Sequence, residues 1–270
     1  MLVISCVKQV PDTTQVQIDP VTNTLVREGI PFIMNPYDTH ALEESLRLKD
    51  RFGVKAITLS MGPPNAEATL RKACAVGVDR AILLSDRVFG GADTLATSKV
   101  LSAAIERLGG DEEVALVICG KQTIDGDTAQ VGPGIASRLG YSQLTLVDAI
   151  EALDLEKKVV RVRRKLEGRH EIVEAPLPAV LTVVRELNRP RYPTVPMRLA
   201  AQVAEIEVWN NEVLKLDVNG IGLKGSPTWV SRIFSPERDK GEILGDGAAD
   251  PVGTAHLLVD KLLDKDLLVL

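Results

Sequence analysis

A polar stretch that directly follows an apolar run holds the residues best suited to chemistry. The run VALVIC (114–119) leads into GKQTIDGDTAQVGPG (120–134), which combines four glycines with acidic and amide side chains. Pro133 is tolerated only in the first turn of a helix, so a helix must begin shortly before it. The stretch therefore brings free backbone N–H groups and the positive end of a helix to one place, which suits phosphate oxygens.

The familiar nucleotide motifs do not account for this stretch. Gly120–Lys121 lacks the upstream glycine spacing and the following Ser or Thr of a Walker loop. The run from Gly132 to Ser137 resembles only half of the dinucleotide fingerprint G-x-G-x-x-G, and it begins a dozen residues after the apolar run. Phosphate binding here would rest on the backbone and the helix end.

A second turn could contribute to the same chemistry. Asp93-Thr94-x-x-Thr97 opens a predicted helix directly after the turn that contains Gly90-Gly91. Thr94 and Thr97 could bind phosphate, or Asp93 could serve only as the N-cap of the helix, and the residues alone favour neither.

Other reactive residue types form no motif that indicates catalysis. Asp125 and Asp127 resemble an acid–base or metal pair, but no histidine or third carboxylate is near in sequence. Acidic residues in turns usually cap the backbone, so turn formation and ligand hydrogen bonding are favoured for both. The remaining candidates are too dispersed for a catalytic, zinc or disulfide site: His40, His170, His256, Cys6, Cys74 and Cys119.

These residues must be positioned by a sheet with helices on both faces. Four apolar runs predict buried parallel strands at 2–7, 56–61, 81–85 and 114–119. Between or after them lie predicted helices at 37–52, 64–77, 93–109 and 132–140, each closed by a glycine. This order predicts an α/β fold with a doubly wound, Rossmann-like parallel sheet of the adenine-nucleotide-binding type. Ligands of such sheets bind beyond the carboxyl ends of the strands, where the loops after all four runs carry glycine, proline or small polar residues.

The rest of the chain departs from this alternation. Residues 10–35 predict a hairpin inserted at the edge of the sheet, and residues after 142 predict three or four antiparallel strands. Their basic run VRVRRK alternates with valine, which favours a solvated strand face over an anion site. Three prolines then indicate an exposed loop within RPRYPTVP. The tail ends in an amphipathic helix but has no evident core of its own, so we expect it to lie against a partner.

Composition excludes several classes of protein. The 32 basic and 37 acidic residues give a net charge of −5, which argues against nucleic-acid binding. No apolar run approaches the ~18 residues of a transmembrane helix. The N-terminus lacks the basic region and the cleavage site of a signal peptide, so the expected location is cytoplasmic.

Several segments together resemble a known family. The pattern GKQxIDxDxxQxG (120–132) resembles the signature of the β subunit of electron transfer flavoprotein. Other segments agree with it in order: CVKQVPD (6–12), MNPYD (34–38), ALEESLRLKD (41–50) and LNRPRYPTVP (187–196).

The resemblance implies a heterodimer with an α subunit that carries FAD, and in ordinary members a β subunit that buries AMP without a redox role. It also implies an α/β nucleotide-binding domain at 1–188, a partner recognition loop at 189–200 with Val195 as its exposed anchor, and a C-terminal arm at 201–270 that packs on the α subunit. The implied nucleotide site comprises Cys6, Asn35, Met61, Gly120, Lys121, Gln122, Thr123, Ile124, Asp125, Gly126, Asp127, Thr128, Ala129, Gln130 and Val131.

The sequence differs from ordinary members in a consistent way. Those members resemble DDDxNQTGQ, whereas this chain reads DGDTAQVGP at 125–133 and FGGADTLAT at 89–97. Both segments resemble the flavin-bifurcating and nitrogen-fixation-associated branch, whose β subunit holds a second FAD in place of AMP. This implies that Gly126 and the Gly-Gly turn leave room for a diphosphate, which Asp93, Thr94 and Thr97 would help to bind.

In that branch NADH delivers a hydride to the β flavin and the electrons then separate. One goes to a low-potential acceptor such as ferredoxin or flavodoxin, and the other passes through the α flavin to a quinone oxidoreductase or an acyl-CoA dehydrogenase. Two alternatives stay open: an ordinary carrier with structural AMP, and a stand-alone nucleotide-binding regulatory protein.

Overall fold

The computed structural model describes residues 1–268 except 13–16, 19–24, 27–30 and 232–240. Two compact units are present, Met1–Ser231 and Arg232–Leu270. The turn of the expected hairpin lies outside the described residues.

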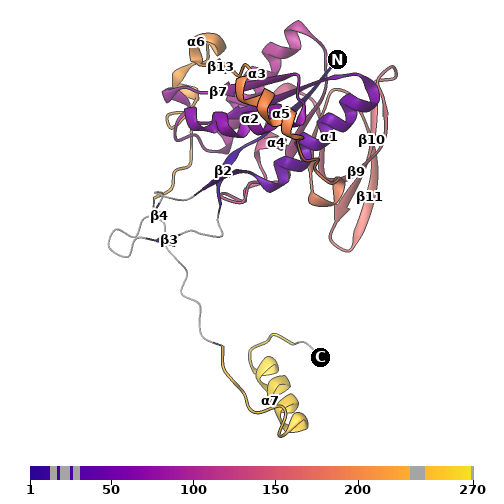
Figure 1. Ribbon diagram of the computed structural model, residues 1–270. Helices are drawn as coiled ribbons and strands as arrows, with labels where there is room; N and C mark the ends of the chain where they lie inside the picture. The colour runs from indigo at the N-terminus through magenta and orange to yellow at the C-terminus, as the bar shows by residue number, and fades with distance from the viewer. Residues whose placement is uncertain (13–16, 19–24, 27–30, 232–240, 269–270) are drawn as a thin grey trace. The chain divides into compact units, whose positions relative to one another are not determined.

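The first unit is built on a nine-stranded sheet with the order β11-β10-β9-β12-β8-β1-β6-β7-β13 (Figure 1). The four predicted strands form its centre and pair in parallel, which confirms the fold class. They are β1 (Leu2–Cys6), β6 (Lys55–Met61), β7 (Arg80–Leu84) and β8 (Val114–Gly120).

Helices cover both faces of this sheet, and this explains why its strands are continuously apolar. They are α1 (Pro36–Phe52), α2 (Glu67–Val76), preceded by a short 3-10 turn at Pro64–Ala66, α3 (Thr94–Asp111) and α4 (Val131–Leu139). Ile4 belongs to the core cluster that includes residues of α3 and α4, whereas Val3 belongs to the cluster that includes residues of α1. Alternate side chains of one strand thus enter opposite layers.

The predicted helix ends are confirmed in three cases and wrong in one. Gly53, Gly77 and Gly140 adopt left-handed conformations that end α1, α2 and α4. The expected end at Gly109 is wrong, because α3 continues through Gly109 and Gly110 to Asp111. Glycine ends a helix by adopting a positive φ, which Gly109 does not do.

The insertion and the antiparallel strands also differ from expectation. The described residues between 9 and 34 form two antiparallel two-stranded sheets, one of them the expected hairpin pairing, and neither adds a strand to the main sheet. Their strands are β2 (Gln9–Pro11), β3 (Gln17–Ile18), β4 (Leu25–Val26) and β5 (Phe32–Met34). Strands β9 (Ser142–Asp154), β10 (Val159–Leu166) and β11 (Arg169–Pro176) are antiparallel as expected, but β12 (Ala179–Val183) is inserted in parallel between β8 and β9.

The basic strand β10 is a solvated face, as expected, rather than an anion site. Four of its cations pair with carboxylates of neighbouring elements: Arg161 with Glu151, Arg163 with Asp148, Arg164 with Glu171 and Lys165 with Glu186.

The start of the tail belongs to the first unit, not to a separate arm. Strand β13 (Glu207–Trp209) pairs with the edge strand β7, and the Trp209 ring is buried with the Arg107 guanidinium 5.5 Å from its centroid. Ile221 is buried in the same core. The boundary expected at 201 therefore lies at 231, because these apolar side chains complete the domain's own core.

After β12, the described residues contain three further α-helices. The expected loop 189–200 contains the start of α5 (Val195–Val203), and α6 (Asn211–Leu214) follows β13. The second unit contains α7 (Pro251–Asp264). In the part of the chain that the structure describes, no helix is both long enough and apolar enough to cross a membrane.

Candidate nucleotide-binding site

The loop after β8 leaves the carboxyl edge of the sheet between two neighbouring strands. β8 pairs with β1 on one side and β12 on the other, and the Lys121 N–H donates to the Val183 carbonyl at 2.8 Å. The loop 120–131 therefore begins at the edge of the sheet where ligands of this fold bind.

Asn35 fixes the first half of this loop from the start of α1. Its side chain is fully buried; the amide nitrogen donates to the Gln122 carbonyl at 2.9 Å, and the amide oxygen accepts from the Ile124 N–H at 3.2 Å. One side chain thus satisfies a backbone donor and a backbone acceptor about a turn apart. The structure supports a role for Asn35 in shaping the site.

Asp38, one helical turn further along α1, joins two loops. Its buried carboxylate accepts from the Lys8 N–H after β1 at 2.8 Å and from the Gly120 N–H at 3.1 Å. A Cβ at position 120 would collide with the Asp38 carboxylate, so glycine is required there. Asp38 belongs to the segment MNPYD but was not among the residues expected in the site. The signal in the sequence was an acidic residue in the first turn of a helix that begins with Asn-Pro.

Burial raises the pKa of Asp38 to about 7 from 3.8, although hydrogen bonds from Asn35 and from the Lys8 and Gly120 N–H groups lower it. The folded protein then binds this proton more tightly than the unfolded chain does. The contribution of Asp38 to the free energy of unfolding is therefore greatest at acid pH and declines as pH rises from about 4 to about 7.

We expect Asp38→Asn to remove this pH dependence. Urea unfolding of wild type and variant at several pH values measures it, because the free energy of unfolding of the wild type should fall relative to the variant across the interval. A constant difference between the two curves would contradict this.

Asp125 and Asp127 lie in the turn of the loop, and their side chains bind other groups of the protein. Asp125 is bound by the Lys8 ammonium at 2.7 Å, and Asp127 accepts from the Gln122 side chain at 2.7 Å. The backbone is left-handed at Asp127 and Ala129, with φ of 52° and 56°. Among the described residues no cluster of three histidine, cysteine or acidic side chains could hold a metal ion.

The second half of the loop presents unused donors. Within the described chain, the backbone N–H groups of residues 128–132 donate to no protein oxygen. The Asp127 N–H donates to the Thr123 carbonyl at 2.9 Å, and the next bond of this kind runs from the Gly134 N–H to the Gln130 carbonyl at 2.9 Å. These groups lead into the N-terminus of α4, where the helix dipole favours an anion. This donor set fits a phosphate, as expected from the sequence.

Two helix N-termini meet at this point. The Thr94 hydroxyl, in the first turn of α3, donates to the Gln130 side chain at 2.7 Å. The helices pack closely because a Cβ on Gly134 would come within 2.8 Å of Ser98. Thr97 lies one turn along α3 and is half-buried. The structure thus brings Thr94 into contact with the loop 120–131, although the two are far apart in the sequence.

Asp93 and the glycine pair have structural partners instead. Asp93 caps α3 through the Ala96 N–H at 3.0 Å and also accepts from the Thr228 hydroxyl at 2.8 Å. The Leu223 side chain packs on Gly91, whose φ is +71°, and the Leu223 N–H donates to the Gly90 carbonyl. The reading of Asp93 as an N-cap is thus supported, and the segment around Leu223 packs against one side of the glycine pair.

The remaining expected residues line the ends of the strands. Cys6 and Cys119 are directly paired across β1 and β8, and both are buried. The hydrogen bond to Cys6, together with burial, holds the pKa of the Cys119 thiol well above its usual value, so it stays protonated. Met61, at the end of β6, is partly buried against the same core cluster.

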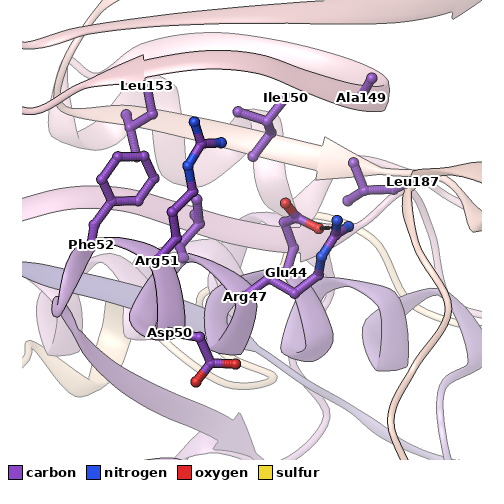
Figure 2. Close-up of a pocket in the computed structure, with 10 residues that line it drawn as sticks. Glu44, Arg47, Asp50, Arg51, Phe52, Ala149, Ile150, Leu153 and Leu187 are labelled. Atoms are coloured by element: carbon purple, nitrogen blue, oxygen red, sulfur yellow. Dashed lines mark hydrogen bonds and ion pairs between the residues drawn. The ribbon is translucent and has the colours of Figure 1, made fainter.

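A separate pocket lies away from this loop. A cavity of about 530 Å³ lies between α1 and β9. Figure 2 shows Arg47, Arg51, Ile150 and Leu153 among the side chains that line it. Arg47 is paired there with Glu44 at 3.2 Å. None of the residues expected in the nucleotide site lines this cavity.

Comparison with known proteins agrees with this geometry. Residues 22–214 match the family model described as electron transfer flavoprotein domain. The chain is 47% identical to Protein FixA of Azotobacter vinelandii over 262 residues, which is 96% of this chain and 93% of that protein. It is 46% identical to the electron transfer flavoprotein subunit beta of Clostridium acetobutylicum over 245 residues, 90% and 92% of the two chains. It is also 45% identical to the caffeyl-CoA reductase-Etf complex subunit CarD of Acetobacterium woodii over 270 residues, 99% and 100% of the two.

Proposed function

Since the chain belongs to the electron transfer flavoprotein family and has the role of its beta subunits, we propose that the loop 120–131 binds the diphosphate of an FAD. The observation that carries this proposal is the meeting of two helix N-termini, with Thr94 on one and the free N–H groups of 128–132 on the other. A single phosphate needs one such end, whereas a diphosphate can use both.

The protein's part in the chemistry is to position and to bind. A bound FAD would supply the chemistry of hydride acceptance and of single-electron transfer, and NADH would be the hydride donor. Asn35 and Asp38 hold the loop in the shape that presents its N–H groups, and the protonated Cys119 thiol adds no negative charge beside a phosphate. One electron would go to a ferredoxin or flavodoxin, and the other through the α-subunit FAD to a quinone oxidoreductase or an acyl-CoA dehydrogenase.

One observation favours the ordinary carrier with structural AMP as a second candidate. Leu223 packs on Gly91, which limits the space beside the glycine pair for a nucleotide larger than AMP. Nucleotides extracted from the purified heterodimer separate the two proposals, because FAD in the β site gives two flavins and AMP gives one flavin and one AMP.

We place the heterodimer in the cytoplasm.

The second unit is the proposed contact with the α subunit. Helix α7 has no buried residue, and Val252, Leu257 and Leu258 are exposed. We expect the amides of residues 251–264 to exchange rapidly with deuterium in the chain expressed alone and to become protected in the heterodimer. A soluble monomer whose α7 is already fully protected would contradict this assignment.

Val195 is the proposed anchor for the acceptor dehydrogenase. Its side chain is 69% exposed at the first turn of α5, between Pro193 and Pro196. Val195→Asp places a charge where an apolar pocket of the partner must be filled, so we expect slower electron delivery with unchanged flavin content and reduction by NADH. Stopped-flow transfer to an acyl-CoA dehydrogenase measures this, and unchanged kinetics would remove Val195 from the interface.

A further inference from the structure

Residues 188–204 carry an exposed apolar surface. Tyr192 and three α5 side chains face solvent, with exposed fractions of 94% for Tyr192, 69% for Val195, 60% for Leu199 and 87% for Val203. The three helical residues are spaced by four, so they lie along one side of α5. Of the helix itself only Ala201 is buried. Burial of its own side chains therefore does little to fix α5 in place.

The middle of this segment stands over a cavity. A space of about 670 Å³ separates it from α1 and α2, with Leu42, Leu46 and Val76 on the inner side and Tyr192 and Pro193 on the outer side. Figure 1 shows α5 beside these two helices. Because close packing is interrupted there, polar contacts at the two ends of the segment add to the packing of α5 on α2.

The first end is held by a charged contact on α1. The Glu43 carboxylate, almost fully buried, accepts from the Arg191 backbone N–H at 2.9 Å and from its guanidinium at 2.9 and 3.1 Å. Arg191 also reaches Asp50 at 2.8 Å. Next to it, the Asn188 amide donates to the His40 carbonyl and to Glu44. These contacts fix both the backbone and the side chain at the entry to the segment.

The second end is held by a cation on α2. The Arg71 guanidinium donates to the carbonyls of Ala201, Gln202 and Ala204 at 3.0, 2.8 and 3.3 Å. The last carbonyls of a helix lack intrahelical partners and carry partial negative charge, so one guanidinium satisfies and attracts them together. Glu67 orients Arg71 from the previous turn at 2.9 Å.

We propose that Glu43 and Arg71 are positioning residues that hold residues 188–204 as a preformed docking element for the acceptor protein. The inference rests on the proposed function of Val195. Holding apolar side chains in a fixed array lowers the conformational entropy lost on binding, so the two clamps act on the affinity for the partner rather than on the electron-transfer step.

The test combines a mobility measurement with kinetics on the complete heterodimer. A nitroxide at Leu199→Cys reports the motion of α5, and an acyl-CoA dehydrogenase serves as the probe acceptor. In Glu43→Gln and in Arg71→Met we expect a more mobile nitroxide and a KM for the acceptor at least about tenfold higher. The kcat at saturation and the flavin content should stay unchanged.

Asp148→Asn is the matched control. The buried Asp148 carboxylate pairs with Arg163 at 2.9 Å and with His170 at 3.1 Å among β9, β10 and β11, at the opposite edge of the sheet from β13, so this variant should alter neither mobility at 199 nor KM. An unaltered nitroxide spectrum in the clamp variants, or higher mobility without a change in KM, overturns the proposal. Val195→Asp separates docking through Val195 from the ordering of α5 by Glu43 and Arg71. An unchanged KM in that variant refutes docking through Val195, whereas the nitroxide spectra of the clamp variants still report whether Glu43 and Arg71 order α5.

Discussion

Two FAD per heterodimer are expected on extraction of the wild-type protein, and Thr94→Val is expected to release one of them. The Thr94 hydroxyl lies at the N-terminus of α3 and donates to Gln130 beside the free N–H groups of the loop. Loss of a hydrogen bond to a charged phosphate costs roughly 1.5–3 kcal/mol, or about one to two decades of affinity. The variant should therefore lose the β flavin and reduction by NADH while the α flavin remains.

The measurement is the number of flavin and AMP molecules per heterodimer before and after the substitution. Thr94→Ser keeps the hydroxyl and serves as the matched control, so its flavin content should equal that of the wild type. One FAD and one AMP in the wild type would refute the FAD proposal and leave the ordinary carrier. Two flavins in both Thr94 variants would remove Thr94 from the site.

Asn35→Ala is expected to weaken nucleotide binding at least about a hundredfold, whichever nucleotide the site holds. The substitution leaves the Gln122 carbonyl and the Ile124 N–H without their partner, and an unsatisfied buried polar group costs about 1–3 kcal/mol. The loop should then lose the conformation that directs the N–H groups of 128–132 to one point. The dissociation constants of the purified chain for AMP and for FAD measure the effect.

Asn211→Ala provides a closely matched control for this experiment. The Asn211 side chain makes the same kind of paired contact, donating to the Leu216 carbonyl at 3.0 Å and accepting from the Leu216 N–H at 3.1 Å. Asn211→Ala therefore removes as many hydrogen bonds as Asn35→Ala does, but none of them involves the loop 120–131. Equal loss of affinity in both variants would show that general destabilisation, not the loop, explains the result.

The sequence by itself determined the centre of the fold and the region of the site. Strands β1, β6, β7 and β8 were found because burial on both faces makes each a continuous apolar run. Helix ends at Gly53, Gly77 and Gly140 were found because a left-handed residue is a local requirement. The start of α4 followed from Pro133 in the same way. Each of these features depends on a few neighbouring residues.

Only the tertiary structure decided which distant residues meet. Asp38 and Asn35 hold a loop that lies more than 80 residues away, and Thr94 contacts Gln130 across two helices. The parallel placement of β12 and the addition of β13 to the far edge also depend on pairing between distant strands. A local pattern gives the period and the ends of an element but not its neighbours. The clamps on residues 188–204 lie beyond sequence reasoning for this reason, since Glu43 and Arg71 are ordinary helical charges until the fold places a backbone against them.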